Sequence, residues 1–133
     1  MRVRFADTDA QGHVFFANYF TFCDEALTGY MRAVGIPWQD LIETGVDMFY
    51  ASAHCDYKGP ARFEDTLAIG ARIARLGRSS MEFELEIRTQ ERDTLVANGR
   101  LVGVCVDRNT GTPVEVPAAL RAALNAFEGR SKK

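Results

Sequence analysis

The apolar residues of the segment Asn18–Val34 recur every three or four positions, which is the spacing of one face of an α-helix. They are Tyr19, Phe22, Cys23, Ala26, Leu27, Tyr30, Met31 and Val34. Asn18 is placed to cap the start of this helix, and Gly35 followed by Pro37 predicts its end. Because the apolar stripe is broad and rich in aromatic residues, we expect this helix to lie in the centre of the core.

A short helix is predicted over Trp38–Glu43. After it, apolar residues recur at every second position instead of every third or fourth. In the clearest segment, Met81, Phe83, Leu85 and Ile87 alternate with Glu82, Glu84, Glu86 and Arg88. This alternation is typical of a strand with one buried and one solvated face, as in an antiparallel sheet. Strands are predicted over Val3–Phe5, Val46–Tyr57, Thr66–Leu76, Ser80–Gln90 and Leu95–Asp107, and a closing helix over Ala118–Phe127 after Pro117.

This order of elements predicts an α+β fold in which an antiparallel sheet wraps around one long central helix. The 133 residues form a single predicted domain, 1–133, with residues 129–133 as a frayed tail. One helix covers one face of such a sheet, so we expect two copies to associate through an exposed edge strand.

Composition excludes several classes of protein. The longest stretch without Lys, Arg, Asp or Glu, Ala10–Cys23, is shorter than the ~20 residues that span a bilayer. The segment Met1–Asp7 has no apolar stretch of a secretory signal. A sequence pI near 5.7 does not favour nucleic acid as a partner. The three scattered cysteines predict neither a disulfide framework nor a zinc site; we expect them to fill the core of a cytoplasmic protein.

The segment Asp7–Phe20 carries the residues best suited to chemistry. Two carboxylates, Asp7 and Asp9, precede the long helix, whose N-terminus favours negative charge and an oxyanion on a bound carbonyl. Gly12 allows close approach to the backbone, and His13 can move a proton near neutral pH. Together these groups suit attack on an activated acyl group. Spacing alone leaves a second interpretation open, in which the aspartates are turn or capping residues and the histidine is structural.

The run Val3–Tyr19, VRFADTDAQGHVFFANY, resembles the signature of the hotdog-fold acyl-CoA thioesterases, the 4-hydroxybenzoyl-CoA thioesterase-like group. The resemblance continues in order through Gly35–Trp38, Tyr57–Ile69 and Gly77–Ser80, and so covers nearly the whole chain. It implies a hotdog fold and hydrolysis of acyl-CoA to free acid and CoA. It implies no metal and no cofactor, since CoA is part of the substrate.

The resemblance also implies roles for individual residues. Asp9 matches the catalytic carboxylate, which acts either as nucleophile on the thioester carbonyl or as general base for water. The backbone N–H of Phe16 matches the group that polarises the thioester oxygen, Gly12 matches the loop glycine, and Asp7 matches an acid that holds the loop. Many relatives carry a histidine where this chain has Phe16, which leaves the role of His13 open.

The phosphates of CoA require local positive charge despite the formal net charge of −2. Candidate CoA-binding residues lie in or beside predicted turns: Lys58, Arg62, Arg75 and Arg78. Ser79 belongs to the turn that resembles the family's contact with pantetheine and nucleotide, and Tyr57 opens the segment Tyr57–Asp65 beside the substrate.

Phe15 and Phe16 either line an apolar or aromatic acyl pocket or simply pack in the core. The resemblance places that pocket between two subunits of a homodimer or homotetramer, with Asp9 of one chain facing Tyr57–Asp65 of the other. Neither nucleic acid nor membrane is an expected partner.

Two other functions fit the same fold. The first is a non-catalytic hotdog dimer that binds acyl-CoA or acyl carrier protein. The second is a dehydratase or hydratase, but the histidine motifs expected for those enzymes do not occur, and His54 lies in a predicted strand as a structural residue. The sequence leaves open the acyl group, the choice between dimer and tetramer, and whether Met1 is the native start.

Overall fold

The computed structural model describes residues 1–129, in which the α-helices and the four long strands follow the predicted order. The elements are a 3-10 helix η1 (Phe5–Asp7), α1 (Asn18–Val34), α2 (Trp38–Glu43), β1 (Val46–Tyr57), β2 (Leu67–Leu76), β3 (Ser80–Thr89), β4 (Thr94–Asp107) and α3 (Ala118–Phe127). The predicted helix over residues 18–34 is confirmed at both ends. The strand ends predicted at Thr66, Gln90 and Leu95 each differ by one residue. Of the predicted tail, residues 130–133 lie outside the described chain.

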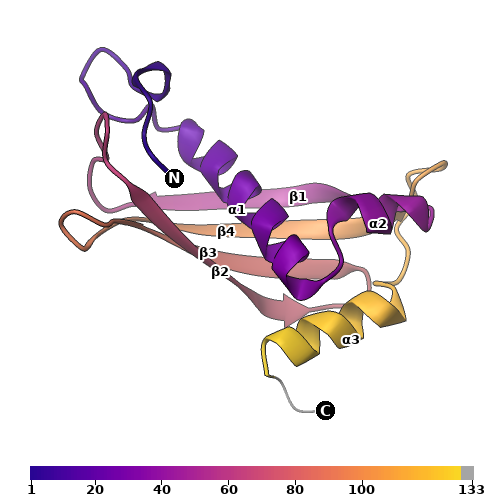
Figure 1. Ribbon diagram of the computed structural model, residues 1–133. Helices are drawn as coiled ribbons and strands as arrows, with labels where there is room; N and C mark the ends of the chain where they lie inside the picture. Colours follow the sequence, from indigo (N-terminus) through magenta and orange to yellow (C-terminus); the bar gives the residue numbers. More distant parts are fainter. Residues whose placement is uncertain (130–133) are drawn as a thin grey trace.

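The four strands form one antiparallel sheet in the order β1-β4-β3-β2. Figure 1 shows α1 running across one face of this curved sheet, with α3 at one end and the N-terminal loop at the other. Strands β2, β3 and β4 are joined by short turns, whereas β1 and β2 occupy the two edges. The predicted hotdog architecture, a sheet around one long helix, is confirmed.

The core forms where the stripe of α1 meets the inward face of the sheet. Tyr19, Phe22, Cys23, Leu27, Tyr30 and Met31 of the stripe are buried, and Ala26 and Val34 pack partly buried against them. On β3 the four alternating apolar residues 81, 83, 85 and 87 are all buried. Gly35 ends α1 in the left-handed conformation at φ 98°, which a glycine adopts without a steric penalty.

Two local predictions near the N-terminus are wrong. Residues 3–5 form no strand; Arg2 makes a single bridge to Thr66, and Phe5–Asp7 turn into η1. The backbone N–H and the guanidinium of Arg4 donate to the Asp7 carboxylate, and this local pairing turns the chain away from the sheet. Asn18 is not the N-cap of α1, since Ala17 holds that position. Its side-chain amide instead donates to the Asp7 carbonyl at 2.9 Å.

The cysteines are free thiols, as predicted. Cys23 and Cys105 fill the core, but Cys55 is only half-buried, so the expectation of three core cysteines is correct for two of them. Burial raises the pKa of Cys23 to about 12 and that of Cys105 to about 11. These two thiols therefore stay protonated and unreactive near neutral pH. Within residues 1–129, no helix has both the length and the apolar character that crossing a bilayer requires.

Candidate active site

The loop that leads into α1 is a small hairpin closed on itself. Thr8 and Val14 form a bridge, the Asp9 N–H donates to the His13 carbonyl at 2.9 Å, and the Gly12 N–H donates to the Asp9 carbonyl at 3.0 Å. Gly12 has φ 80°, a conformation that favours glycine. The sequence of this turn therefore fixes the position of Asp9 locally.

The side chain of Asp9 is half-buried and held on one side only. Its Oδ1 accepts the Gln11 N–H at 2.9 Å, as in an Asx turn. Its Oδ2 has no hydrogen-bond partner among the residues that the structure describes. The turn interpretation and the catalytic interpretation of Asp9 thus do not exclude each other, since they concern different oxygens of the same carboxylate.

Asp7 has a different environment. It is 5% exposed, and the Arg4 guanidinium donates to its carboxylate at 2.9 Å. Its backbone carbonyl accepts the Phe15 N–H and the Asn18 side chain. Asp7 therefore holds the loop against the start of α1, as the resemblance implied.

The start of α1 leaves two backbone donors available. The Phe15 N–H donates to Asp7 and the Asn18 N–H donates to Phe15. Between them, the N–H groups of Phe16 and Ala17 have no acceptor anywhere in residues 1–129. Phe16 is 61% exposed, so a ligand can reach this turn from solvent. The predicted polarising group, the Phe16 N–H, is therefore unpaired.

The segment Tyr57–Asp65 of the same chain lies against this loop. The Val14 N–H donates to the Ala61 carbonyl at 2.8 Å, and His13 pairs with Arg62. The Tyr57 hydroxyl donates to the Phe16 carbonyl at 2.7 Å. The contact expected from a partner subunit is thus made within one chain, which gathers Asp9, Gly12, His13, Phe15, Phe16, Tyr57, Lys58 and Arg62 at one end of the sheet.

The other predicted CoA-binding residues, Arg75, Arg78 and Ser79, lie at the opposite end. Tyr57 pairs with Ala97 of β4, whereas Ser80 pairs with Val104, seven residues further along that strand. At ~3.4 Å per residue this separates the two ends by about 24 Å. The carbonyl of Arg78 also accepts the Val116 N–H near α3. Within a single chain, these three residues therefore do not reach the Asp9 loop.

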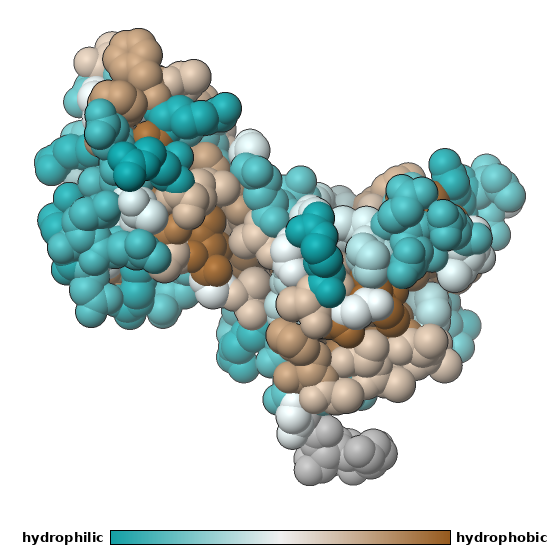
Figure 2. All heavy atoms as spheres, viewed as in Figure 1, coloured by the Kyte–Doolittle hydropathy of each residue, from teal (hydrophilic) through white to brown (hydrophobic). Residues whose placement is uncertain are grey.

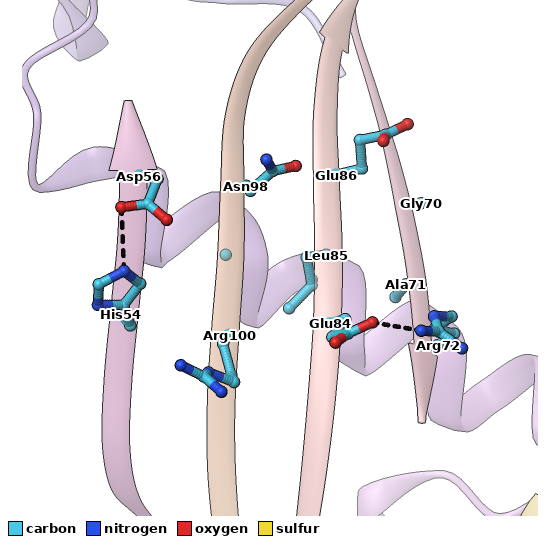
Figure 3. A pocket seen from close by; sticks show the side chains of 11 residues that line it. His54, Asp56, Gly70, Ala71, Arg72, Glu84, Leu85, Glu86, Asn98 and Arg100 are labelled. Carbon is cyan, nitrogen blue, oxygen red and sulfur yellow. Dashed lines mark hydrogen bonds and ion pairs between the residues drawn. The ribbon is translucent and has the colours of Figure 1, made fainter. Parts of the chain in front are cut away.

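A cavity of about 640 Å³ lies elsewhere, on the sheet face away from α1 (Figure 3). Its lining includes a row of paired residues across all four strands, namely His54, Arg100, Glu84 and Arg72. Within this row Arg72 is bound to Glu84, whereas His54 lies 3.0 Å from Asp56 and Arg100 lies 3.6 Å from Glu82. The sequence analysis did not predict this cavity. The available signal was the presence of Gly70 and Gly99 within strands, since a glycine there leaves space on the face of the sheet. None of the predicted site residues lines it.

Exposed aromatic rings gather around the Asp9 loop. Phe15 and Phe16 lie 4.9 Å apart between ring centroids, Phe16 lies 6.4 Å from Tyr57, and Phe5 meets Phe63 at 6.0 Å. Figure 2 shows apolar residues at the surface of the part of the molecule that holds this loop, at the upper left. Phe15 is 44% exposed, which contradicts plain core packing and leaves its ring available to a ligand. No three His, Cys, Asp or Glu side chains of the described part of the chain are grouped to hold a metal ion.

Acid is expected to destabilise the loop through Asp7. The side-chain hydrogen bond from Arg4 lowers the pKa of Asp7 from its ordinary value near 3.8 by more than burial raises it. The unfolded chain then binds this proton at a higher pH than the folded chain. The stabilisation is therefore complete above about pH 5 and is lost as the pH falls through the lowered pKa.

The measurement is the free energy of unfolding in urea at pH values from about 6 down to 2. Asp7→Asn is expected to flatten the acid limb of this curve. Asp93→Asn is the control, because the Asp93 carboxylate is 90% exposed and lies 3.9 Å from its nearest cation. Equal acid limbs in the wild type and in Asp7→Asn would contradict the assignment.

An antiparallel sheet wrapped around one long helix defines the class of hotdog-fold proteins. The sequence model of the Thioesterase-like superfamily matches residues 3–124. The chain belongs to this superfamily, and its enzyme class is thioester hydrolase, as predicted.

Individual relatives agree with this assignment. The acyl-CoA thioesterase YbgC of Haemophilus influenzae is 31% identical over 127 residues, which cover 94% of this chain and 91% of the relative. The structure of a gentisyl-coenzyme A thioesterase superimposes with a TM-score of 0.83 at 30% identity, covering 93% of this chain and 96% of its own. A thioesterase of Thermus thermophilus, crystallised with coenzyme A and Zn, gives a TM-score of 0.83 at 30% identity, covering 98% of this chain and 95% of its own.

Proposed function

We propose that this protein hydrolyses acyl-CoA thioesters to the free acid and CoA, with Asp9 as the reacting carboxylate. The observation that carries the proposal is that one loop holds both a carboxylate oxygen of Asp9 without a partner and the unpaired N–H of Phe16. Similarity to relatives named acyl-CoA thioesterases, and to a structure that contains coenzyme A, supports the choice of substrate.

The thioester carbonyl oxygen would accept the Phe16 N–H, which becomes a stronger interaction as that oxygen gains negative charge. As nucleophile, Asp9 Oδ2 attacks the carbonyl carbon, the C–S bond breaks, and the CoA thiolate leaves and takes a proton from water. Hydroxide or a second water then hydrolyses the mixed anhydride. As general base, Asp9 instead removes a proton from water while the water oxygen attacks, and the thiolate receives that proton.

The remaining site residues would bind the two ends of the substrate. The exposed rings of Phe15 and Phe16 supply an apolar surface for the acyl group, and Gly12 leaves the backbone accessible beside it. Lys58 and Arg62 are exposed cations at the same end of the sheet, where they can meet phosphate. His13, held through its backbone beside Arg62, assists the proton transfer or remains structural.

A homodimer through the free edge of β1 would complete the CoA site. Strand β1 pairs with β4 on one side only, and its residue Phe49 is 55% exposed. Antiparallel pairing of two β1 edges reverses the partner, and so brings its β2–β3 turn to the end of the sheet where Tyr57 lies. Arg75, Arg78 and Ser79 would then reach the active site of the other subunit. Light scattering after size exclusion would show a dimer, or a tetramer of such dimers; a monomer that is fully active contradicts this arrangement.

The activity test measures thiol release from short, long and aromatic acyl-CoAs. We expect turnover on at least one of them without added metal or cofactor. Tight retention of acyl-CoA or acyl carrier protein with no turnover would instead support the non-catalytic dimer. We place the enzyme in the cytoplasm, because its three thiols are free and scattered.

A further inference from the structure

Tyr57 is tied to the active-site loop by a hydrogen bond between residues 41 positions apart in the chain. Its hydroxyl donates to the Phe16 carbonyl at 2.7 Å. Its ring packs edge-on against Phe16, with centroids 6.4 Å apart, and against the buried Tyr19, at 5.2 Å. The strand end that carries it is pinned, since the next residue donates its N–H to the Val96 carbonyl at 2.8 Å.

This bond acts on a peptide unit that has a free donor at its other end. The Phe16 carbonyl and the Ala17 N–H belong to the same planar peptide group. A hydrogen bond accepted by the carbonyl fixes the plane of that group and polarises its N–H, which makes the N–H a better donor. In the described chain this N–H, like that of Phe16 before it, has no acceptor.

We propose that Tyr57 is a positioning residue for thioester hydrolysis: through the Phe16–Ala17 peptide it holds the Ala17 N–H, next to the N–H of Phe16, toward the oxygen that gains charge in the reaction. This inference rests on the proposed function. It assigns the Ala17 N–H as a second donor beside that of Phe16, and it gives Tyr57 a task distinct from touching the substrate.

The surroundings of Tyr57 keep its hydroxyl in the donating form. Partial burial, with Cys55 beside it, raises the pKa of Tyr57 to about 12. The bond to Phe16 therefore persists over the working pH range of a hydrolase.

The test compares Tyr57→Phe with Tyr50→Phe. Both variants lose one hydroxyl from β1, but the Tyr50 hydroxyl donates to Asp24 at 2.6 Å, away from the loop. Tyr57→Phe is expected to lower kcat about 10-fold with KM changed less than about 2-fold, because the lost interaction serves mainly the transition state. Tyr50→Phe should keep wild-type kinetics, and circular dichroism should show both variants folded. A Tyr57→Phe kcat within about 2-fold of the wild type overturns the proposal.

A spectroscopic readout separates this proposal from the proposed function. The thioester carbonyl stretch of bound benzoyl-CoA is measured by infrared difference spectroscopy in Asp9→Asn and in Asp9→Asn/Tyr57→Phe. Polarisation by the N–H groups lowers this frequency, so removal of the Tyr57 hydroxyl should move it back toward that of free benzoyl-CoA. An unchanged frequency overturns the role of Tyr57 even where Asp9→Asn is inactive. A wild type that binds benzoyl-CoA but hydrolyses no acyl-CoA overturns the proposed function. In that case the infrared shift still tests whether Tyr57 polarises the bound carbonyl.

Discussion

Replacement of Asp9 by asparagine is expected to lower kcat by about 100-fold or more on the best acyl-CoA substrate. An amide has almost the shape of a carboxylate, but it neither attacks a carbonyl as a nucleophile nor accepts a proton from water at neutral pH. The free Oδ2 of Asp9 is the oxygen that this substitution disables, since Oδ1 is already engaged by the Gln11 N–H. The measurement is steady-state release of CoA thiol across the substrate panel.

The same variant separates catalysis from loop structure. An asparagine side-chain oxygen can still accept the Gln11 N–H, so the turn should survive and the free energy of unfolding should change by less than about 0.5 kcal/mol. Asp56→Asn is the matched control, because Asp56 is an exposed acid on the far face of the sheet, 3.0 Å from His54. Wild-type turnover in Asp9→Asn, or equal losses in both variants, would show that Asp9 is only a turn residue.

Phe83→Ala is expected to lower the free energy of unfolding by about 3–5 kcal/mol. Phe83 is 0% exposed at the middle of β3, and its ring meets the Tyr30 ring of α1 edge-on at 6.0 Å between centroids. Truncation removes the largest fully buried side chain from the contact between the helix and the sheet and leaves a cavity. Urea denaturation followed by circular dichroism measures the loss.

Phe127→Ala is the control for this prediction, since Phe127 packs against the same Tyr30 at 5.3 Å but is 49% exposed. It should lose about 1 kcal/mol, because about half of its surface already faces water. If the two variants lose equal stability, the contact between α1 and β3 is not the centre of the core.

The candidate site shows the limits of inference from local pattern. The Asp9 turn follows from Gly12 and from hydrogen bonds within a few residues, so a short segment of sequence is enough to indicate it. The N-terminus behaves differently. Val3 and Phe5 have strand propensity, but the interaction of Arg4 with Asp7 outweighs it. Asn18 does not cap the helix, because its side-chain amide donates to the Asp7 carbonyl across the loop. A buried acceptor available in three dimensions changes the partner that a polar side chain selects.

The sequence by itself determined the three α-helices, the four long strands and their buried faces, because side-chain period and glycine stops act over a few residues. Helix α1, for example, begins and ends where its apolar stripe does. Only the tertiary structure decided which residues share a site. In the tertiary structure Tyr57 is hydrogen-bonded to Phe16, and Arg78 lies at the opposite end of the sheet from Asp9. A cavity lined in part by Gly70 lies on the outer face of the sheet. These relations depend on strand order and register, which the packing of the whole sheet on α1 sets and which no short segment encodes.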